Sequence, residues 1–233
     1  MTITTASFCI VAAYLIGSIP VPYLVGRMRG LDIRAYGSGN VGASNVWQSV
    51  SKALVVPVGL TQAGQGLAGV LLARALGQGP GAQVAAGVAV VIAHNWNPWF
   101  GVQGGRGIGP TFGVMLGLSW PVLIVFAAIS LVGVTIRRIP ETMLVAIITM
   151  PVVAIAAGVD EAVVAGFAVL AAVLLCKRLL ANGAPQPQYD RPGVWLTRLV
   201  CDRDTPDREA WLHRSPAAPN DIALGLRSTR SPD

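Results

Sequence analysis

The chain has 233 residues, of which 53% are hydrophobic and only 12% charged, and its mean hydropathy is +0.60. Soluble domains carry about 25% charged residues, so this composition excludes an ordinary soluble globular protein. The formal net charge of +6 could indicate a nucleic-acid partner. Most of the basic residues, however, flank apolar segments or lie near the C-terminus, as the preference of Lys and Arg for cytoplasmic loops requires. We therefore expect an all-α, polytopic integral membrane protein that binds no nucleic acid.

The first apolar segment extends from about Ala6 to Gly26, which is long enough for a helix to cross a bilayer. Pro20 and Pro22 interrupt it near its inner end, and the carbonyls that they free must be satisfied by protein or water. The first positive side chain is Arg27. Because nothing basic precedes the apolar run, we expect no cleaved signal peptide and a first helix whose N-terminus faces outward.

A polar loop follows, and it contains a run of small, hydrogen-bonding residues from Gly37 to Asn45. Its glycines permit positive φ and close approach of a ligand, and successive bare N–H groups form a nest that suits an anion. Three arginines precede it at positions 27, 29 and 34. We expect a phosphate site here; the alternative is a polar interhelical turn with good capping residues. The candidate phosphate-binding residues are Gly37, Ser38, Gly39, Asn40 and Asn45.

The next spans are expected at Ala53–Ala73 and Gln83–Trp96. The apolar run from Ile108 to Ile136 fits either one tilted span or two short ones. Ser119-Trp120-Pro121 offers a break in the middle of this run. Two spans place all the later basic clusters on the same side as the first loop, so we predict two.

Two further spans, Thr142–Ala157 and Ala162–Cys176, are joined by an outer turn. The sequence thus predicts seven transmembrane helices with the N-terminus outside and the C-terminus inside, which leaves Arg74 as the one basic residue on the outer side. Glycines at positions 105, 109, 113 and 117 recur every four residues and indicate close helix packing.

The domain boundary is expected after residue 181. Residues 1–181 form the membrane domain, and residues 182–233 form a basic, Pro- and Arg-rich cytoplasmic tail that we expect to be largely disordered. Within the tail, Trp195, Leu196, Leu199 and Val200 could form an amphipathic turn on the inner leaflet.

A second glycine-dense stretch from His94 to Gly107 faces the same side as the first loop in this topology. Arg106 is placed to hold a phosphate through two parallel N–H bonds, or to act only as a positive anchor of the inner side. His94 could be a general base, a hydrogen-bonding ligand or an interfacial residue beside Trp96. The phosphate-binding candidates in this stretch are Gly104, Gly105, Arg106 and Gly107, and the catalytic candidates in the whole chain are Ser38, His94 and Arg106.

Other kinds of site find less support. A nucleophilic triad of Ser38, His94 and Asp32 lacks a nucleophile elbow, and no Gly-Lys-Ser/Thr follows a strand as in a Walker loop. The three cysteines are far apart, and the inner loops contain no cluster of His, Asp or Glu. We therefore expect no metal and no organic cofactor.

Three segments, Tyr14–Pro20, Leu31–Asn45 and Gly104–Gly107, resemble the bacterial acyl-phosphate:glycerol-3-phosphate acyltransferases of the PlsY type. The similarity extends in order from about Tyr14 to Leu180. It implies a seven-helix enzyme of the bacterial plasma membrane whose active site opens to the cytoplasm. It also implies the reaction, in which a fatty acyl group moves from acyl phosphate to the 1-hydroxyl of glycerol 3-phosphate and gives lysophosphatidate and phosphate. The partners are these two substrates and membrane lipid.

The resemblance implies that Ser38 and Asn40 bind substrate phosphate and that Arg106, a lysine in the family, stabilises the anionic transition state. The sequence also departs from the family pattern. Gln48 stands where an arginine is expected, and Gln62 and Gln65 replace an acid and a lysine. Counted from Arg178-Leu179, the family's late histidine and asparagine fall at Ala172 and Leu175. The His-x4-Asp pattern of the other large glycerolipid acyltransferase class is absent, since Trp99 and Ala218 occupy the fifth position after the two histidines.

Three interpretations follow. The first is a divergent acyltransferase that uses Arg106, the glycine loops and His94. The second is a catalytically altered or inactive paralogue that binds a phosphorylated lipid or glycerol phosphate. The third is a transporter, because interrupted helices also occur there, but the sequence shows no matching second half.

Overall fold

The computed structural model describes residues 3–181, 183–185 and 187–212. Within these ranges the regular elements are all helical, and no strand occurs. The α-helices are α1 Ile3–Ser18, α2 Val21–Met28, α3 Ala43–Ser49, α4 Val55–Ala75, α5 Pro80–Asn95, α6 Ile108–Leu118, α7 Trp120–Thr135, α8 Ile139–Ala156, α9 Glu161–Leu180, α10 Val194–Cys201 and α11 Arg208–Leu212. The 3-10 helices are η1 Ile33–Ala35, η2 Lys52–Leu54, η3 Pro98–Phe100 and η4 Pro187–Tyr189.

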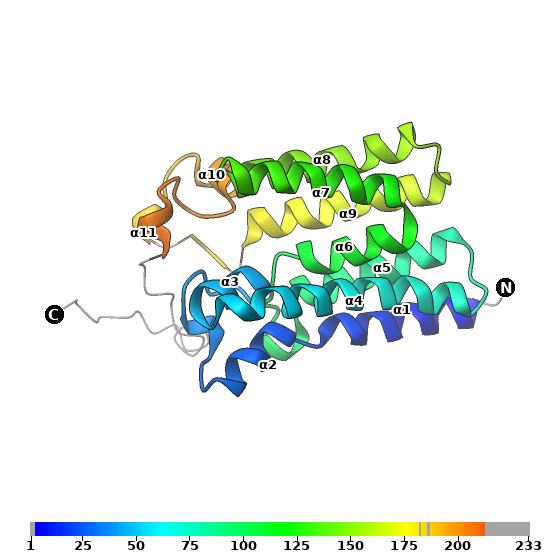
Figure 1. Cartoon of the computed structure of the whole chain (residues 1–233), viewed down its shortest axis with the longest axis horizontal. Helices are drawn as coiled ribbons and strands as arrows, with labels where there is room; N and C mark the ends of the chain where they lie inside the picture. The colour runs from blue at the N-terminus through cyan, green and yellow to red at the C-terminus, as the bar shows by residue number, and fades with distance from the viewer. Residues whose placement is uncertain (1–2, 182, 186, 213–233) are drawn as a thin grey trace.

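The long helices lie side by side along the long axis of the molecule (Figure 1). Helices α1, α4, α5 and α6 form one half of the bundle, and α7, α8 and α9 form the other. The short helices α2, α3, α10 and α11 gather at the end opposite the N-terminus. The glycine loops and the C-terminal segment therefore meet at one end of the bundle.

The outer surface of the bundle is apolar. Four segments are long and apolar enough to cross a membrane: Ile3–Met28, Lys52–Ala75, Ile139–Ala156 and Glu161–Leu180. The segments Ile108–Leu118 and Trp120–Thr135 are shorter apolar helices. Large apolar side chains point outward, among them Ile155 at 66% and Leu131 at 63% exposure. Such a surface requires lipid as its solvent, which agrees with the predicted all-α membrane protein.

The first apolar segment is broken at Pro20, as its sequence predicts, and protein groups satisfy the freed carbonyls. Gln65 Nε2 on α4 donates to the carbonyls of Ile16 and Ile19, at 2.8 and 3.0 Å. Asn97 Nδ2 donates to the Ser18 carbonyl at 2.8 Å. The break is therefore held by groups from α4 and from the loop after α5.

The predicted break between Ile108 and Ile136 is at Ser119, between α6 and α7. Three glycines of α6, Gly109, Gly113 and Gly117, lie against Gln62, Ala63 and Val70 of α4. A Cβ on Gly113 would lie 1.8 Å from the Ala63 carbonyl oxygen, so the two backbones are in direct contact. The glycine repeat thus packs α6 on α4, whereas Gly105 belongs to the loop before α6.

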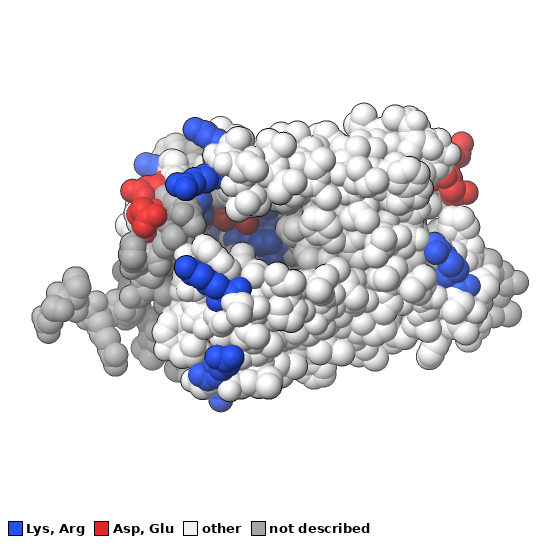
Figure 2. All heavy atoms as spheres, viewed as in Figure 1, with Lys and Arg blue, Asp and Glu red and all other residues white. Residues whose placement is uncertain are grey.

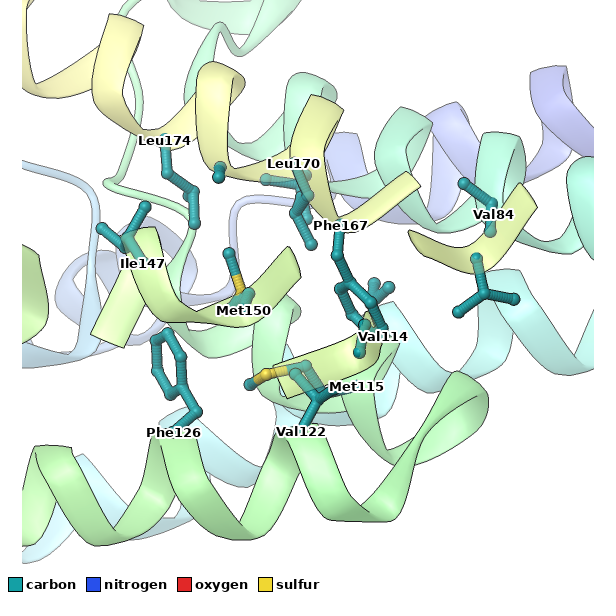
Figure 3. Packing of buried hydrophobic residues seen from close by; sticks show 14 of the residues in the cluster. Val84, Val114, Met115, Val122, Phe126, Ile147, Met150, Phe167, Leu170 and Leu174 are labelled. Atoms are coloured by element: carbon teal, nitrogen blue, oxygen red, sulfur yellow. The ribbon is translucent and has the colours of Figure 1, made fainter. Parts of the chain in front are cut away.

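The main apolar core lies between α6, α7, α8 and α9 (Figure 3). Met115 and Val122 lie close together near the α6–α7 break, and Met150 lies between Phe126 and Leu170. Phe126 also meets Phe112 edge to face, with ring centroids 5.2 Å apart. This core joins the two halves of the bundle and leaves the polar groups to its loop end.

The described part of the segment that was expected to be a largely disordered tail contains helices α10 and α11. Helix α10 packs on α8 and α9, and the buried Arg198 holds it there. Arg198 Nε pairs with Asp204 Oδ1 at 2.6 Å, and its Nη1 donates to the carbonyls of Leu179 and Gly183, each at 3.0 Å. Arg198 thereby caps the C-terminus of α9. Residues 213–233 of the predicted tail lie outside the described residues.

Candidate functional site

The first glycine loop is organised around one buried amide, that of Asn45. Its Nδ2 donates to the carbonyls of Ile33, Tyr36 and Asn40, at 2.9, 3.1 and 3.1 Å. Its Oδ1 accepts from the backbone N–H of Ser38 at 3.3 Å. Asn45 is fully buried, so its amide serves the loop itself.

Gly37 and Gly39 have the positive φ that this loop requires, at +55° and +70°. A Cβ on Gly37 would lie 2.4 Å from Asn45 Oδ1, so a larger residue would displace the amide. Within the loop, Ser38 Oγ accepts from the Asn40 N–H at 3.4 Å.

Asp32 and Arg34 brace the chain that enters this loop. Arg34 Nη2 lies 2.7 Å from Asp32 Oδ2, and Asp32 Oδ1 accepts from the Arg34 backbone N–H at 3.1 Å. The Arg34 guanidinium also lies over the rings of Tyr23 and Phe100, 5.1 and 4.8 Å from their centroids. Hydrogen bonding to the Arg34 side chain lowers the pKa of Asp32, and the same bond raises the pKa of Arg34. Arg34 is thus committed to holding the loop.

The second glycine loop touches the first. The Val41 N–H donates to the Gly104 carbonyl at 3.4 Å, and the Gly105 N–H donates to the His94 carbonyl at 3.1 Å. A Cβ on Gly105 would lie 2.1 Å from His94 Nε2 and 2.7 Å from the Val41 carbonyl oxygen. Only a glycine at position 105 allows the two loops and the imidazole to come this close.

Helix α6 begins directly after this contact. Its N-terminal residue is preceded by Gly107, at φ +78°, whose carbonyl accepts from the N–H and the hydroxyl of Thr111. The N–H groups of Ile108 and Gly109 lie in the first turn, where a helix offers no internal acceptors. Both residues line a cavity.

This cavity has a volume of about 1030 Å³ and lies between the two halves of the bundle. Figure 2 shows basic and acidic atoms at the bottom of a hollow between α4 and α7. The cavity has two chemically different parts. Its polar lining includes Ser38, Asn40, Ser44, Gln48, His94, Arg106, Arg178 and Asp202, and its apolar lining includes Val55, Leu60, Phe112, Val134, Met143, Ile147 and Leu174.

Three basic side chains approach the polar part. Arg106 Nε lies 2.8 Å from Asp202 Oδ1, and Arg106 Nη1 donates to the Lys177 carbonyl at 3.4 Å. Lys177 is fully buried, with its Nζ 5.4 Å from the centroid of the Trp96 ring. Arg178 Nη2 donates to the carbonyls of Pro140 and Val200, each at 2.9 Å. The polar part is therefore positive, with the carboxylates of Asp202 and Glu141 among its basic side chains.

The predicted site residues fall into two groups in this arrangement. Ser38, Asn40, His94, Arg106 and Gly107 line the cavity. The others, which form or fix the backbone of the two loops beside it, are Gly37, Gly39, Asn45, Gly104 and Gly105. Of the three glutamines that depart from the family pattern, Gln48 and Gln62 line the cavity, whereas Gln65 is bound to the α1–α2 break.

Sequence reasoning missed Arg178, Lys177 and Asp202 as members of this site. The cavity-lining residues of α9 are Leu174 and Arg178, whereas Ala172, where the family pattern places a histidine, is exposed. Lys177 and Arg178 looked like ordinary inner-side basic residues, and Asp202 belonged to a segment expected to be disordered. Among the described residues, no group of three His, Cys, Asp or Glu side chains could hold a metal ion.

Comparisons with known proteins identify relatives of this chain over most of its length. The family model for glycerol-3-phosphate acyltransferase matches residues 7–182. A glycerol-3-phosphate acyltransferase of Synechococcus sp. (strain CC9902) is 36% identical over 181 residues, which cover 74% of this chain and 90% of the relative. One of Brucella suis biovar 1 (strain 1330) is 35% identical over 181 residues, which cover 75% and 89%.

Two solved structures are also similar. Both are crystal structures of PlsY (YgiH), an integral membrane glycerol 3-phosphate acyltransferase. The glycerol 3-phosphate form has a TM-score of 0.70 at 28% identity and covers 74% of this chain and 88% of that chain. The lysophosphatidic acid form has a TM-score of 0.68 at 27% identity and covers 74% and 87%. With most of its length matched by the family model and by these relatives, the chain belongs to the glycerol-3-phosphate acyltransferase family.

Proposed function

We propose that this chain transfers a fatty acyl group from acyl phosphate to the 1-hydroxyl of glycerol 3-phosphate within the cavity between α4 and α8. The observation that carries the proposal is the continuity of this cavity. A positive, glycine-bounded part leads directly into an apolar part between the helices. The first suits phosphate groups and the second suits an acyl chain. The proposal places the enzyme in phospholipid synthesis.

The reaction requires the protein to position the two substrates and to neutralise their negative charge. The oxygen of the glycerol 1-hydroxyl forms an ester bond to the acyl carbonyl carbon, and the bond from that carbon to the phosphate oxygen breaks. Inorganic phosphate leaves with the electron pair, and the hydroxyl proton passes to His94, to phosphate or to water. Because the acyl phosphate is already activated, no covalent intermediate on the enzyme is needed.

Within this proposal, Ser38, Asn40 and the first turn of α6 bind phosphate oxygens, and Arg106 stabilises the negative charge that develops during transfer. Asn45 and the glycines at 37, 39, 104 and 105 act through the loops that they shape. Lys177 and Arg178 supply positive charge where the sequence has lost the arginine expected at position 48. His94 lies against Gly105 at the cavity wall, where it can accept a proton from the acceptor hydroxyl.

We also propose that the chain crosses the bacterial plasma membrane seven times, with the N-terminus outside and the site facing the cytoplasm. The distribution of charge supports this topology, because Figure 2 shows most Lys and Arg atoms at the end that carries α3 and α10. Arg74 lies at the opposite end of α4, where it donates to the Gly117 carbonyl. Helix α6 has only eleven residues, and the glycine loop before it lines the cavity, where irregular backbone is tolerated.

The test is an end-point assay on the purified full chain with palmitoyl phosphate and labelled glycerol 3-phosphate. We expect lysophosphatidate from the wild type and a loss of about 10²–10³-fold in kcat/KM for Arg106→Gln, because the variant removes a charge that stabilises the transition state. Ser38→Ala should lose about tenfold, the effect of one hydrogen bond.

The matched controls are Arg29→Gln and Ser51→Ala, which change the same residue types outside the cavity. Both should stay within about twofold of the wild type, as surface changes usually do. If the wild type binds glycerol 3-phosphate but forms no lysophosphatidate, the chain has a phosphate site without catalysis and the proposed reaction is wrong.

A further inference from the structure

The phosphate-binding candidate Arg106 is already in contact with an anion of the chain itself. Its Nε lies 2.8 Å from Asp202 Oδ1, and its Nη2 lies 3.5 Å from the Asp202 backbone carbonyl. The side chains of Arg106 and Asp202 are 13% and 25% exposed, so the pair is mostly shielded from water. The carboxylate forms an ion pair with the guanidinium that would receive a phosphate oxygen, although neither Arg106 Nε nor Asp202 Oδ1 has a hydrogen-bond partner among the described residues.

Asp202 is held at this position from both sides. It ends α10 with φ +55°, and its N–H donates to the Arg198 carbonyl at 2.9 Å. On one side, Arg178 binds the Val200 carbonyl. On the other, Asp204 is paired with the buried Arg198. This segment lies beyond residue 182, where the match to the family model ends. The carboxylate therefore belongs to a segment outside the part of the chain that the family model matches.

The charges around Asp202 do not balance. Asp202 and Arg106 both act electrostatically on Lys177 and Arg178, and Glu141 acts on Arg178 as a second carboxylate, so two carboxylates face three basic side chains. A phosphate monoester carries nearly two negative charges at neutral pH and has three acceptor oxygens. It therefore matches this cluster better than the carboxylate of Asp202 does.

We propose that Asp202 is an internal competitor of substrate phosphate at Arg106 and thereby sets the affinity of the site for its phosphorylated substrates. The proposal deepens the function proposed above and rests on it. Binding of the phosphate group displaces the carboxylate from Arg106, while the Arg198–Asp204 pair keeps α10 on α9. Asp202 thus raises the KM of the substrate that it competes with, and it leaves kcat unchanged.

The experiment compares the full chain with Asp202→Asn. Asparagine tolerates the left-handed backbone at this position, so the variant removes the charge and keeps the local fold. We expect KM to fall about tenfold for the competing substrate, the equilibrium effect of removing one ion-pair partner of this kind, with kcat within about twofold. KM is measured separately for glycerol 3-phosphate and for palmitoyl phosphate. The substrate whose KM falls is the one whose phosphate group binds Arg106. The control is Asp190→Asn, an exposed acid of the same segment, with an unchanged KM.

Two results would overturn the proposal. A fall in kcat at constant KM would make Asp202 a positioning residue for Arg106. Unchanged kinetics would mean that the Arg106–Asp202 contact contributes nothing to the free energy of substrate binding. Calorimetric binding of glycerol 3-phosphate and of inorganic phosphate separates this proposal from the proposed reaction. Tighter binding to Asp202→Asn in a chain without turnover supports the competition and refutes the reaction, and turnover with unaltered binding does the reverse.

Discussion

The ion pair of Asp32 and Arg34 shows how single residues fix the first glycine loop. Both side chains are partly exposed, at 27% and 19%, and both belong to the short turn that leads from α2 to the loop. Asp32 also accepts the Arg34 backbone N–H, a bond that an asparagine side chain can replace. The charge of Asp32 can therefore be tested separately from its capping role.

The variant Asp32→Asn should be less stable than the wild type at pH 7, by about 1 kcal/mol or less for a pair at this exposure. The pKa of Asp32 is lowered in the folded protein from its usual 3.8. Its charge therefore stabilises the fold above pH 3.8, and this contribution is lost as the pH falls through the lowered value. Thermal unfolding in detergent between pH 7 and pH 3 should show the difference shrinking toward zero. A difference that stays constant over this range would contradict an electrostatic origin.

At this scale the sequence predicted the residue types of the site better than their roles. Ser38 and Arg106 do line the cavity, as a glycine-rich loop with basic neighbours indicates. Asn45 is in the same loop, yet its amide is used up by three carbonyls that only the folded loop brings together. Asp202 could not be predicted, because its partner Arg106 is 96 residues away along the chain.

The pairing of α4 with α6 shows that close helix packing depends on glycines, whose lack of a side chain lets the two backbones touch. A Cβ on Gly113 would lie 1.8 Å from the Ala63 carbonyl oxygen, an atom of the backbone that cannot move aside alone. By contrast, nothing lies within 4 Å of a Cβ placed on Gly64, which is exposed on α4.

We therefore expect Gly113→Ala to destabilise the protein by about 1–3 kcal/mol, the usual cost of an overpacked core. The matched variant Gly64→Ala should be neutral or stabilising by up to about 1 kcal/mol, since alanine is the better helix former. Thermal unfolding of both variants in the same detergent measures the contrast. Equal stability of the two variants would mean that α4 and α6 can separate without cost.

Element boundaries were predictable where the chain itself signals them. Pro20 and the Ser119-Trp120-Pro121 step both end a helix within a residue or two of the expected place. Helix α10 spans the amphipathic turn that Trp195, Leu196, Leu199 and Val200 indicated, whereas α11 and the packing of these two helices were not predictable, because proline and charge dominate their surroundings in the sequence. Their order depends on a buried arginine that caps another helix, a tertiary contact with no local signature.

For the whole molecule, the seven-span topology makes opposite predictions for its two ends. Gly79 precedes α5 near Arg74, and Arg29 follows α2 at the end that carries the cavity. After Cys9, Cys176 and Cys201 are replaced, a membrane-impermeant maleimide should label Gly79→Cys in intact cells. It should label Arg29→Cys only after the membrane is opened. The reverse labelling pattern would place the cavity on the outer side and refute the proposed orientation.

The capping of α9 by Arg198 has a consequence for the order in which the protein is made. Arg106 and the second glycine loop are synthesised about a hundred residues before Asp202 and Asp204, so Arg106 enters the bilayer before the carboxylate that pairs with it has been made. A nascent chain that ends before residue 202 holds Arg106 without Asp202 beside it. Completion of the last turns of the chain is then the step at which the newly made enzyme acquires its mature affinity.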